Sequence, residues 1–383
     1  MKEIDRTYWH GQIELAWKKK PIVWLAGVRR TGKTTLARGF KGATYVNCDL
    51  PSNQEALSQI ETFLKILKTD VLILDEIHQL PEASQILKII ADEHPKKRVL
   101  ATGSSTLIAS KKFKDSLTGR KTQIHFVPVL VDELESFDVS LKTRIHHGGL
   151  PQMLMASNFD HEFFGEWLDS YYARDIQELF HVEKRQAFLK LLEILFCLNG
   201  KLIDVTELAQ MIGLSRPTVI KYLDIFQLTK AIMILRPFSQ QPLKEIISQP
   251  KIYAFDTGFV CYAKKIDQLR TEDCGDLLEN LTLETLIACG LSCEIQYWRT
   301  KSKLEIDFIL QKNKTEVWSI ECKWNSKNFK LGTLKKFREQ YPKGVNLVVC
   351  HDLQEVVVKK QEKLEVHYVP IHRLLNWIKM NWT

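Results

Sequence analysis

The chain has 383 residues, with 54 Lys and Arg against 46 Asp and Glu, which gives a net charge of +8 at pH 7. Apolar residues make up 45% of the chain and charged residues 26%, as in ordinary folded proteins. No apolar run approaches the roughly 18 residues of a membrane helix, and the first residues contain no apolar signal core. We therefore expect about two to four folded domains, a cytoplasmic location and no membrane partner.

The first third of the chain alternates apolar strands with helices. Between the strands, helices are expected at 53–67 and 82–93. The first of these helices has Leu57, Ile60, Leu64 and Leu67 on one face. Continuously apolar strands separated by helices predict an α/β fold with a parallel sheet covered on both faces. The strands are expected at 21–28, 43–49, 71–76, 98–105 and 123–129.

The middle of the chain is mainly helical from about 140 to 195. The next segment, DVTELAQMIGLSRPTVIKYLDIF, predicts a helix-turn-helix over 204–226. Its first helix should end near Gly213, and Ser215 should cap a second helix with Pro217 in its first turn. Two following β segments, AIMILRPFS and KIYAFDTG, would form the wing of a winged helix. The remainder, from about 259, is predicted to be mixed α/β.

A phosphate loop is predicted by GVRRTGKT at 27–34, which fits G-x-x-x-x-G-K-[ST] directly after a strand and before a helix. Its two glycines allow a turn that points backbone N–H groups at phosphate, beside the positive end of the helix. Lys33 would bridge the β- and γ-phosphates of ATP, and Thr34 would ligate Mg²⁺. The predicted nucleotide-binding loop residues are Gly27, Arg30, Thr31, Gly32, Lys33, Thr34 and Thr35.

The catalytic acids of this site are predicted by VLILDEIH, a strand that ends in two carboxylates. Asp75 should hold the Mg²⁺ ion through water, and Glu76 should orient or deprotonate the attacking water. At the end of the next strand, ATGSS supplies Thr102 and Ser104. Either hydroxyl could bind the γ-phosphate or the attacking water, and the pattern does not decide between them.

The stretch EIDFILQKNKTEVWSIECK, residues 305–323, carries acids and a lysine on two predicted strands. Because strand residues alternate between faces, Glu305 and Asp307 share one face, as do Glu321 and Lys323. The stretch resembles the core of PD-(D/E)xK nucleases, although Ile306 replaces the proline of that pattern. The resemblance implies that Glu279, Asp307 and Glu321 hold Mg²⁺ and that Lys323 stabilises charge on the reacting phosphate.

The surroundings of this stretch favour a polyanionic partner. Residues 311–345 hold nine Lys and Arg and three Glu, a local balance of 9 − 3 = +6. Trp298 and Arg299 could stack on a base or grip a phosphate. Two other interpretations remain open. The domain could bind DNA without cutting it, or the stretch could be an exposed charged hairpin.

Across nearly its whole length the chain resembles the bacterial and archaeal AAA-type ATPases that end in a restriction-endonuclease-like domain. The matching phrases are AGVRRTGKTTL, VLILDEIHQ, ATGSS, LTGR, GGLPQ, YYARDI, PKIYAFDTG, GDLLENL, YWRTKSKLEIDF and IECK. The resemblance implies a homo-oligomer, with a hexameric ring as the default. It also implies an AAA-type P-loop ATPase core at 1–138, a helical lid at 139–185, a winged helix-turn-helix at 186–258 and a PD-(D/E)xK nuclease-like domain at 259–383.

In such a ring, Arg120 of SLTGRK would reach the γ-phosphate bound by a neighbouring subunit, a role suited to the permanent charge of arginine. Arg174 of YYARDIQ is a second candidate. For both arginines the alternative is an ordinary ion pair with a local acid.

These predictions combine into an ATP-hydrolysing motor or switch that binds and remodels or translocates double-stranded or branched DNA. Arg216, Thr218 and Lys221, near the start of the second helix of the helix-turn-helix, would contact DNA, although such modules also serve as protein-binding parts. One alternative is an ATP-regulated, Mg²⁺-dependent nuclease of repair or defence. The other is a nucleotide-dependent scaffold or regulator without DNA chemistry. The eight cysteines form no CxxC pair, which predicts reduced thiols rather than zinc ligands.

Overall fold

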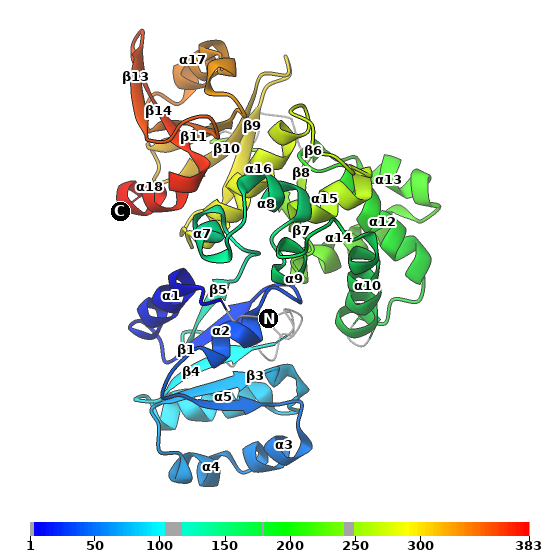
Figure 1. Cartoon of the computed structure of the whole chain (residues 1–383), viewed down its shortest axis with the longest axis vertical. Coiled ribbons are helices and arrows are strands. Elements are labelled where there is room, and N and C mark those ends of the chain that lie inside the picture. Colours follow the sequence, from blue (N-terminus) through cyan, green and yellow to red (C-terminus); the bar gives the residue numbers. More distant parts are fainter. Residues whose placement is uncertain (1–3, 104–116, 178–179, 241–248, 383) are drawn as a thin grey trace. The chain divides into compact units, whose positions relative to one another are not determined.

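The computed structural model describes residues 4–103, 117–177, 180–240 and 249–382 (Figure 1). The chain divides into two compact units, which are described separately. Unit 1 comprises residues 1–127, 170–181 and 228–230, and unit 2 comprises residues 128–169, 182–227 and 231–383.

Unit 1 is built on a parallel five-stranded sheet in the order β2-β3-β4-β1-β5. This confirms the predicted parallel α/β fold. Its strands are β1 (Ile22–Ala26), β2 (Thr44–Asn47), β3 (Val71–Asp75), β4 (Arg98–Thr102) and β5 (Lys121–His125). Its helical elements are α1 (Thr7–Trp17), α2 (Lys33–Arg38), α3 (Pro51–Ser58), α4 (Ile60–Ile66), η1 (Ile77–Gln79), α5 (Ala83–Glu93) and the π-helical turn η4 (Tyr172–Gln177).

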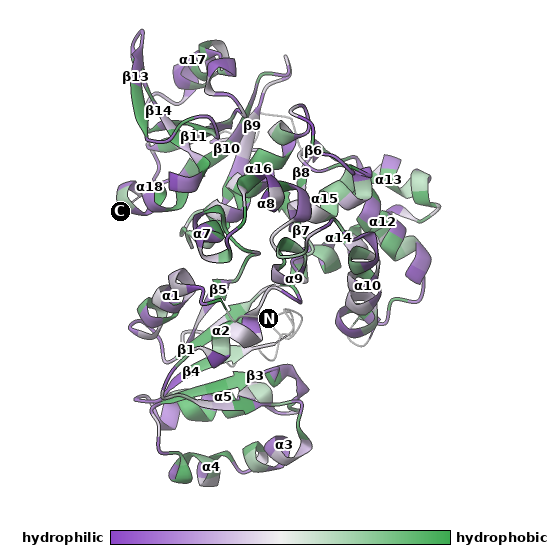
Figure 2. Cartoon of the chain, in the orientation of Figure 1, coloured by the Kyte–Doolittle hydropathy of each residue, from purple (hydrophilic) through white to green (hydrophobic). Residues whose placement is uncertain are grey.

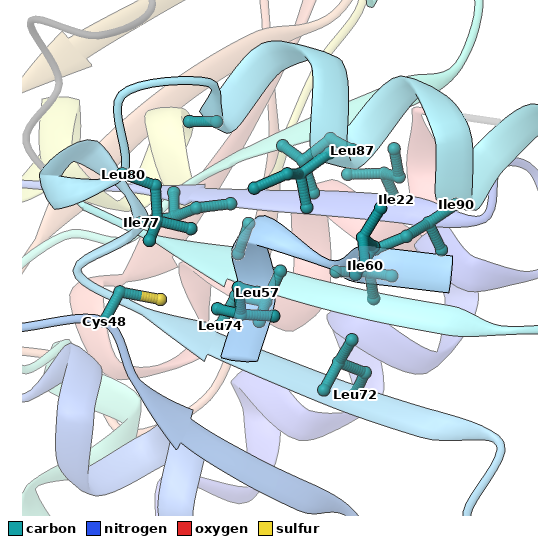
Figure 3. Close-up of a cluster of buried hydrophobic side chains, with 14 of the residues drawn as sticks. Ile22, Cys48, Leu57, Ile60, Leu72, Leu74, Ile77, Leu80, Leu87 and Ile90 are labelled. Atoms are coloured by element: carbon teal, nitrogen blue, oxygen red, sulfur yellow. The ribbon is translucent and has the colours of Figure 1, made fainter. Parts of the chain in front are cut away.

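The central strands of unit 1 are apolar because both of their faces are covered. All five residues of β1 are buried, and Figure 2 shows β3 as hydrophobic along its length. On one face, Leu72 and Leu74 of β3 pack with Leu57 and with Leu87 of α5 in the cluster drawn in Figure 3. Burial of each such leucine contributes roughly 1.5–3 kcal/mol to folding.

The single helix predicted at 53–67 is wrong, because the chain forms two helices there. Gln59 leaves the helical region, with φ −108° and ψ 57°, between α3 and α4. The hydroxyl of Ser58 donates to the carbonyl of Glu55 and helps to end the first helix. The break still leaves Leu57 and Ile60 buried in the same cluster, so the apolar pattern is satisfied by two short helices instead of one.

Unit 2 contains a mixed six-stranded sheet in the order β13-β14-β12-β11-β10-β9 and an antiparallel three-stranded sheet in the order β6-β8-β7. The strands of the large sheet are β9 (Ile295–Arg299), β10 (Glu305–Gln311), β11 (Val317–Cys322), β12 (Asn346–Cys350), β13 (Val357–Gln361) and β14 (Leu364–Pro370). Those of the small sheet are β6 (Lys201–Leu202), β7 (Ile232–Leu235) and β8 (Lys251–Ala254).

The helices of unit 2 surround these sheets. They are η3 (Val131–Glu133), α7 (Leu134–Phe137), α8 (Leu141–His147), α9 (Pro151–Leu154), α12 (Arg185–Cys197), α13 (Val205–Ile212), α15 (Thr257–Lys264), α16 (Cys274–Ala288), η5 (Ser326–Asn328), α17 (Leu331–Gln340), η6 (Ile371–Arg373) and α18 (Leu374–Asn381). Two helices, α10 (His161–Tyr171) and α14 (Arg216–Leu228), start in unit 2 and end in unit 1.

Two helices, α13 and α14, lie where the helix-turn-helix was predicted. Gly213 ends α13 in the left-handed conformation, with φ 65°. The Ser215 hydroxyl accepts from the backbone N–H of Thr218 at 3.3 Å and caps α14. Asp204 caps the first helix in the same way, accepting from the N–H groups of Thr206 and Glu207.

Strand β10 departs from the regular alternation expected of it. Its register with β9 shifts between Ile306 and Ile309, and both of these residues pack in one core cluster although they are three positions apart. One extra residue therefore sits in the strand at Asp307–Phe308. Such bulges re-aim side chains and often lie beside functional sites. Here the bulge contains the acid predicted to be central to the C-terminal site.

A buried ion cluster explains the phrases GGLPQ and FDTG. Arg144 is fully buried in α8, where it donates to Glu284 of α16 and to the hydroxyl of Thr257 at 3.0 Å. Asp256 lies 3.9 Å from the same guanidinium. A Cβ atom at Gly148, where φ is 82°, would overlap the carboxylate of Asp256. These residues hold unit 2 together rather than form an open site.

Among the described residues, no helix is long and apolar enough to cross a bilayer. All eight cysteines are free thiols.

Candidate functional site

The predicted phosphate loop connects β1 to α2 in unit 1. Gly27 lies against β5 so closely that a Cβ atom would overlap the carbonyl oxygen of Phe126. Arg30 and Gly32 both have left-handed backbones, with φ 63° and 95°. The Lys33 ammonium turns back into the loop and donates to the carbonyls of Gly27 and Val28, both at 2.8 Å. It thus lies where the loop curves around the space for phosphate.

Burial lowers the pKa of Lys33, against the opposing effect of the nearby carboxylates of Glu76 and Asp175. Thr34 and Thr35 follow Lys33 in the first turn of α2, where Thr34 is partly buried and Thr35 is exposed. Thr34 thus follows the lysine at the start of the helix, the position that carries the Mg²⁺ ligand in this motif.

The loop is supported from behind by two buried residues. The Thr31 hydroxyl donates to the carbonyl of Val28 at 2.9 Å. Arg6, which is only 5% exposed, donates to the carbonyl of Thr31 at 3.2 Å and to that of Val127 at 3.3 Å. The sequence prediction missed Arg6, because an arginine ahead of a helix gives no sign of where its side chain ends.

The carboxylate of Asp75 is held on both oxygens at the end of β3. The Thr102 hydroxyl, at the end of the adjacent β4, donates to one oxygen, and the Tyr45 hydroxyl donates to the other at 2.7 Å. The backbone N–H of Glu76 donates to the Thr102 hydroxyl at 3.2 Å. Of the two predicted hydroxyls, Thr102 thus fixes both acids, and Ser104 lies outside the described residues. Tyr45 was missed by the sequence prediction.

Glu76 is held in an uncommon conformation beside the loop. Its backbone is left-handed, with φ 55° and ψ 40°, which for a residue with a side chain costs of order 1–3 kcal/mol. Its carboxylate lies 3.2 Å from Nδ1 of His78. Burial raises the pKa of Glu76, but the hydrogen bond with His78 and the charge of Lys33 outweigh it, so the pKa stays below its ordinary value. Glu76 is therefore kept ionised, as a base requires.

The segment that carries Arg174 lies next to the phosphate loop within unit 1. Its Asp175 is 3.6 Å from Nε of Arg29, a residue of the loop, and Arg29 also donates to the carbonyl of Ser170. Burial raises the pKa of Asp175, against the opposing charges of Arg29 and Lys33. Arg174 is exposed on the same turn. Burial lowers the pKa of Arg29, the charge of Asp175 opposes this shift, and the nearby charge of Arg174 lowers the pKa further. Neither Arg29 nor Asp175 was predicted.

Arg120 makes the local ion pair that was the alternative to a role between subunits. Its Nε lies 2.5 Å from one oxygen of Asp92, and its Nη2 donates to the other at 3.0 Å. Both side chains are about one third exposed, at 34% each. Within one chain the Arg120 guanidinium is therefore held by Asp92 of α5. To reach a nucleotide phosphate bound by a neighbouring subunit, Arg120 would have to break this ion pair.

The acids predicted for the C-terminal site meet in unit 2. Four carboxylates form what we call the acid site: Glu279 of α16, Glu305 and Asp307 of β10, and Glu321 of β11. Lys323 lies 2.8 Å from Glu321 and 3.9 Å from Asp307. The backbone N–H of Cys322 donates to Asp307 at 2.7 Å. The predicted acids and Lys323 are thus brought together.

The acid site also holds two cations that were not predicted to belong to it. Lys251 of β8 makes an ion pair with Glu305 and lies 3.9 Å from Glu279, which also accepts from the Tyr253 hydroxyl at 3.0 Å. Arg299 makes an ion pair with the other oxygen of Glu305. Burial and the charge of Asp307 raise the pKa of both Glu279 and Glu321. Burial lowers the pKa of Lys323, but Asp307 and Glu321 raise it to a greater extent.

In this arrangement the three acids predicted to hold Mg²⁺ are paired with lysine side chains. The part of the chain that the structure describes contains no group of three or more His, Cys, Asp and Glu side chains that could hold a metal ion. As they lie here, Glu279 is 3.9 Å from Lys251, and Lys323 is 3.9 Å from Asp307 and 2.8 Å from Glu321. The role of the three acids as Mg²⁺ ligands stays a prediction.

Two of the residues predicted to contact DNA here have structural roles. Trp298 is 3% exposed and packs edge-on against Phe337 of α17, so its ring faces the core and not a base. Arg299 is bound to Glu305, as described above. Arg338, counted in the basic stretch 311–345, is also buried, and donates to the carbonyls of Val317 and Val345 at 2.9 Å each. Other lysines of this stretch are exposed: Lys314, Lys327, Lys330, Lys336 and Lys343. Lys301 and Lys303, ahead of the stretch, are exposed as well.

The helix-turn-helix residues keep their predicted surface positions. Arg216 and Lys221 are exposed on α14, and Thr218 is partly buried beside its cap residue Ser215. The same face also exposes Ile220, at 40%. A mixed surface of this kind is compatible with DNA or with a protein partner.

Comparison with known families agrees with the geometry of unit 1. Residues 19–135 match the family model described as AAA domain. Residues 138–270 and 274–374 match two models described as domains of unknown function, DUF8612 and DUF4143. The chain therefore has an AAA-type P-loop core on a parallel sheet, followed by regions whose families carry no assigned function.

Two relatives align over most of the chain. The uncharacterized protein Rv2008c of Mycobacterium tuberculosis is 27% identical over 322 residues, which cover 80% of this chain and 71% of that protein. The uncharacterized protein MJ1544 of Methanocaldococcus jannaschii is 25% identical over 353 residues, which cover 83% and 78%. Their names assign no activity.

Solved structures show only weak likeness. DnaA from Aquifex aeolicus with bound AMPPCP is 16% identical with a TM-score of 0.26, over 60% of this chain and 90% of that one. A DNA replication initiation factor is 14% identical with a TM-score of 0.24, over 57% and 72%. Scores this low do not establish a shared overall fold.

Proposed function

We propose that the chain is an ATP-hydrolysing switch or motor that acts on DNA. One observation carries the ATPase part of the proposal. Lys33 follows β1, Asp75 ends β3 and Glu76 follows it, and the three charges lie close enough to interact at the carboxyl ends of one parallel sheet, where ligands bind in open α/β folds. The AAA domain match over residues 19–135 supports it independently.

In this proposal the loop and Lys33 bind the phosphates of ATP, and Thr34 and Asp75 hold the Mg²⁺ that neutralises them. The residues fit such an ion, because Asp75 is a buried carboxylate fixed by Thr102 and Tyr45, and carboxylate oxygen is a ligand that Mg²⁺ prefers. Glu76 accepts the proton of the attacking water. For this its carboxylate must turn from His78 toward that water.

The DNA part of the proposal rests on charge and shape in unit 2. Arg216 and Lys221 are exposed near the start of the second helix of a helix-turn-helix, and exposed lysines remain around the large sheet. The proposed partner is double-stranded or branched DNA, with a homo-oligomer as the working assembly. Arg120, released from Asp92, would complete the site of a neighbouring subunit. A nuclease activity is not part of this proposal, because the acid site is neutralised internally.

An ATPase assay with single-stranded, duplex, forked and four-way DNA tests this function. We expect the wild type to hydrolyse ATP, Lys33→Ala to lose hydrolysis, and duplex or branched DNA to raise the wild-type rate. The variant Glu76→Gln is the matched control, since it should bind ATP and not hydrolyse it. Hydrolysis that survives Lys33→Ala would overturn the nucleotide site. A rate that no DNA changes, without DNA retention at moderate salt, would favour a nucleotide-dependent scaffold. Sizing the protein with and without ATP tests the oligomer.

A further inference from the structure

Lys251 is the most deeply buried charge of the acid site. It is 2% exposed, whereas Lys323 at the opposite side of the cluster is 29% exposed. A lysine this buried is uncommon and costs several kcal/mol unless its charge is compensated. The compensation comes from Glu305, Glu279 and Asp307. The Lys251 ammonium makes an ion pair with Glu305 and lies 3.9 Å from Glu279.

The Lys251 ammonium comes from a different part of unit 2 than the carboxylates that it contacts. Lys251 opens β8, which pairs with β6 and β7 in the three-stranded sheet, while the carboxylates belong to α16, β10 and β11. The match to DUF4143 begins at residue 274, after Lys251. The charge that neutralises the acid site is therefore supplied from outside the segment that forms it.

The charges show what Lys251 does there. Counted with every group ionised, the acid site contains four carboxylates and three cations, Lys251, Arg299 and Lys323, which gives a net charge of 3 − 4 = −1. Without Lys251 the balance would be 2 − 4 = −2. A divalent cation would then be the natural counter-ion for carboxylate oxygens.

A second observation marks a place for a cation. Glu321 is 7% exposed, and its Oε1 is buried without a hydrogen-bond partner among the described residues. Its other oxygen is held by Lys323. A buried carboxylate oxygen that no donor satisfies is costly and fits a site completed by a ligand or a proton.

We propose that the Lys251 ammonium takes the place of a divalent metal ion in the acid site. The chain as folded then binds no Mg²⁺ or Mn²⁺ there, and removal of this one charge uncovers a metal site on Glu279, Asp307 and Glu321. Metal-assisted strand cleavage is accordingly not the resting chemistry of unit 2. The proposal concerns unit 2 alone and does not depend on ATP hydrolysis.

Titration with Mn²⁺ in the absence of nucleotide, followed by electron paramagnetic resonance of the free ion, tests this proposal. Four proteins are compared: wild type, Lys251→Met, Lys251→Arg and the double variant Lys251→Met/Asp307→Asn. We expect Lys251→Met to gain one site that binds at least tenfold tighter than any wild-type site and that Asp307→Asn removes. Lys251→Arg, which keeps the charge, should resemble the wild type.

Two results would overturn the proposal. One is a folded Lys251→Met protein, judged by circular dichroism and elution volume, without the additional site. The other is a wild-type Mn²⁺ site that the single change Asp307→Asn abolishes. The second comparison needs no change at Lys251, so it can overturn the proposal even where Lys251→Met does not fold. Lys251→Gln, which keeps a polar group at the position, provides a further folded variant for the first comparison.

Discussion

Replacement of Arg144 by methionine should destabilise unit 2 strongly. The guanidinium is fully buried, donates to the carbonyl of Val129 at 2.5 Å and to Thr257 at 3.0 Å, and compensates the carboxylates of Asp256 and Glu284. Removal of one partner from a buried ion pair costs about 3–5 kcal/mol, because the other charge is left without compensation. We expect a loss of unfolding free energy in that range at pH 8.

The same change should cost less in acid. Burial raises the pKa of Glu284 to about 7 and raises that of Asp256 as well, while Arg144 opposes both shifts. Without Arg144, both carboxylates should take up protons in the folded state as the pH falls toward 5, which removes the uncompensated charge. The destabilisation by Arg144→Met should therefore shrink as the pH is lowered from 8 to 5.

Urea unfolding with hydrogen–deuterium exchange of peptides from α8, α15 and α16 measures this effect in unit 2 alone. The matched control is Arg373→Met, which breaks an exposed pair with Glu355 at 2.8 Å and should cost at most about 1 kcal/mol. Two results would refute the reasoning. One is equal hydrogen–deuterium exchange of these peptides in the wild type and Arg144→Met at pH 8. The other is a loss of unfolding free energy in Arg144→Met no greater than that in Arg373→Met.

Two further predictions follow from the two sites. Thr102→Val removes the hydroxyl that fixes Asp75 and the backbone of Glu76. ATP turnover should therefore fall roughly ten- to a hundredfold, with little change in ATP affinity. The control is Thr69→Val, which removes a hydroxyl remote from these acids and should leave turnover unchanged. Burial and the charge of Asp307 raise the pKa of Glu279 in the folded chain from 4.5 to about 8. The folded chain therefore binds this proton more tightly than the unfolded chain does. The free energy of unfolding should fall as the pH rises from about 4.5 to 8. Glu279→Gln should flatten that part of the urea-midpoint profile, and an unchanged slope would contradict the assignment.

The nucleotide loop and its acids could be predicted because their chemistry is local in the sequence. The loop is one contiguous stretch, and Asp75 and Glu76 end a strand whose apolar run is unmistakable. The helix-turn-helix could be predicted for the same reason, since Gly213 and Ser215 mark its turn directly. In each case the residues that decide the structure are neighbours along the chain.

The residues that were missed act across long sequence distances. Tyr45 reaches Asp75 over 30 residues, and Arg6 reaches Val127 over 121. Strand alternation correctly placed Glu305 beside Asp307, but it could not show the bulge that starts after Ile306. Lys251 had one local sign, a lysine at the start of the otherwise apolar strand KIYA, all of which is buried. A lysine in such an apolar strand predicts a buried positive charge. Only the fold shows which carboxylates lie next to it.

Two buried cations join β8 and its following turn to α16 at two places. Lys251 at the start of β8 compensates Glu279, and Arg144 joins Asp256, just after β8, to Glu284, five residues further along α16. Breaking a buried pair costs about 3–5 kcal/mol, whereas the coupling between distant sites in proteins is typically 1–3 kcal/mol. A coupling of that size is smaller than the cost of losing either pair. If ATP hydrolysis moves unit 2, as the proposed function requires, we therefore expect β8, α16 and the acid site to move together.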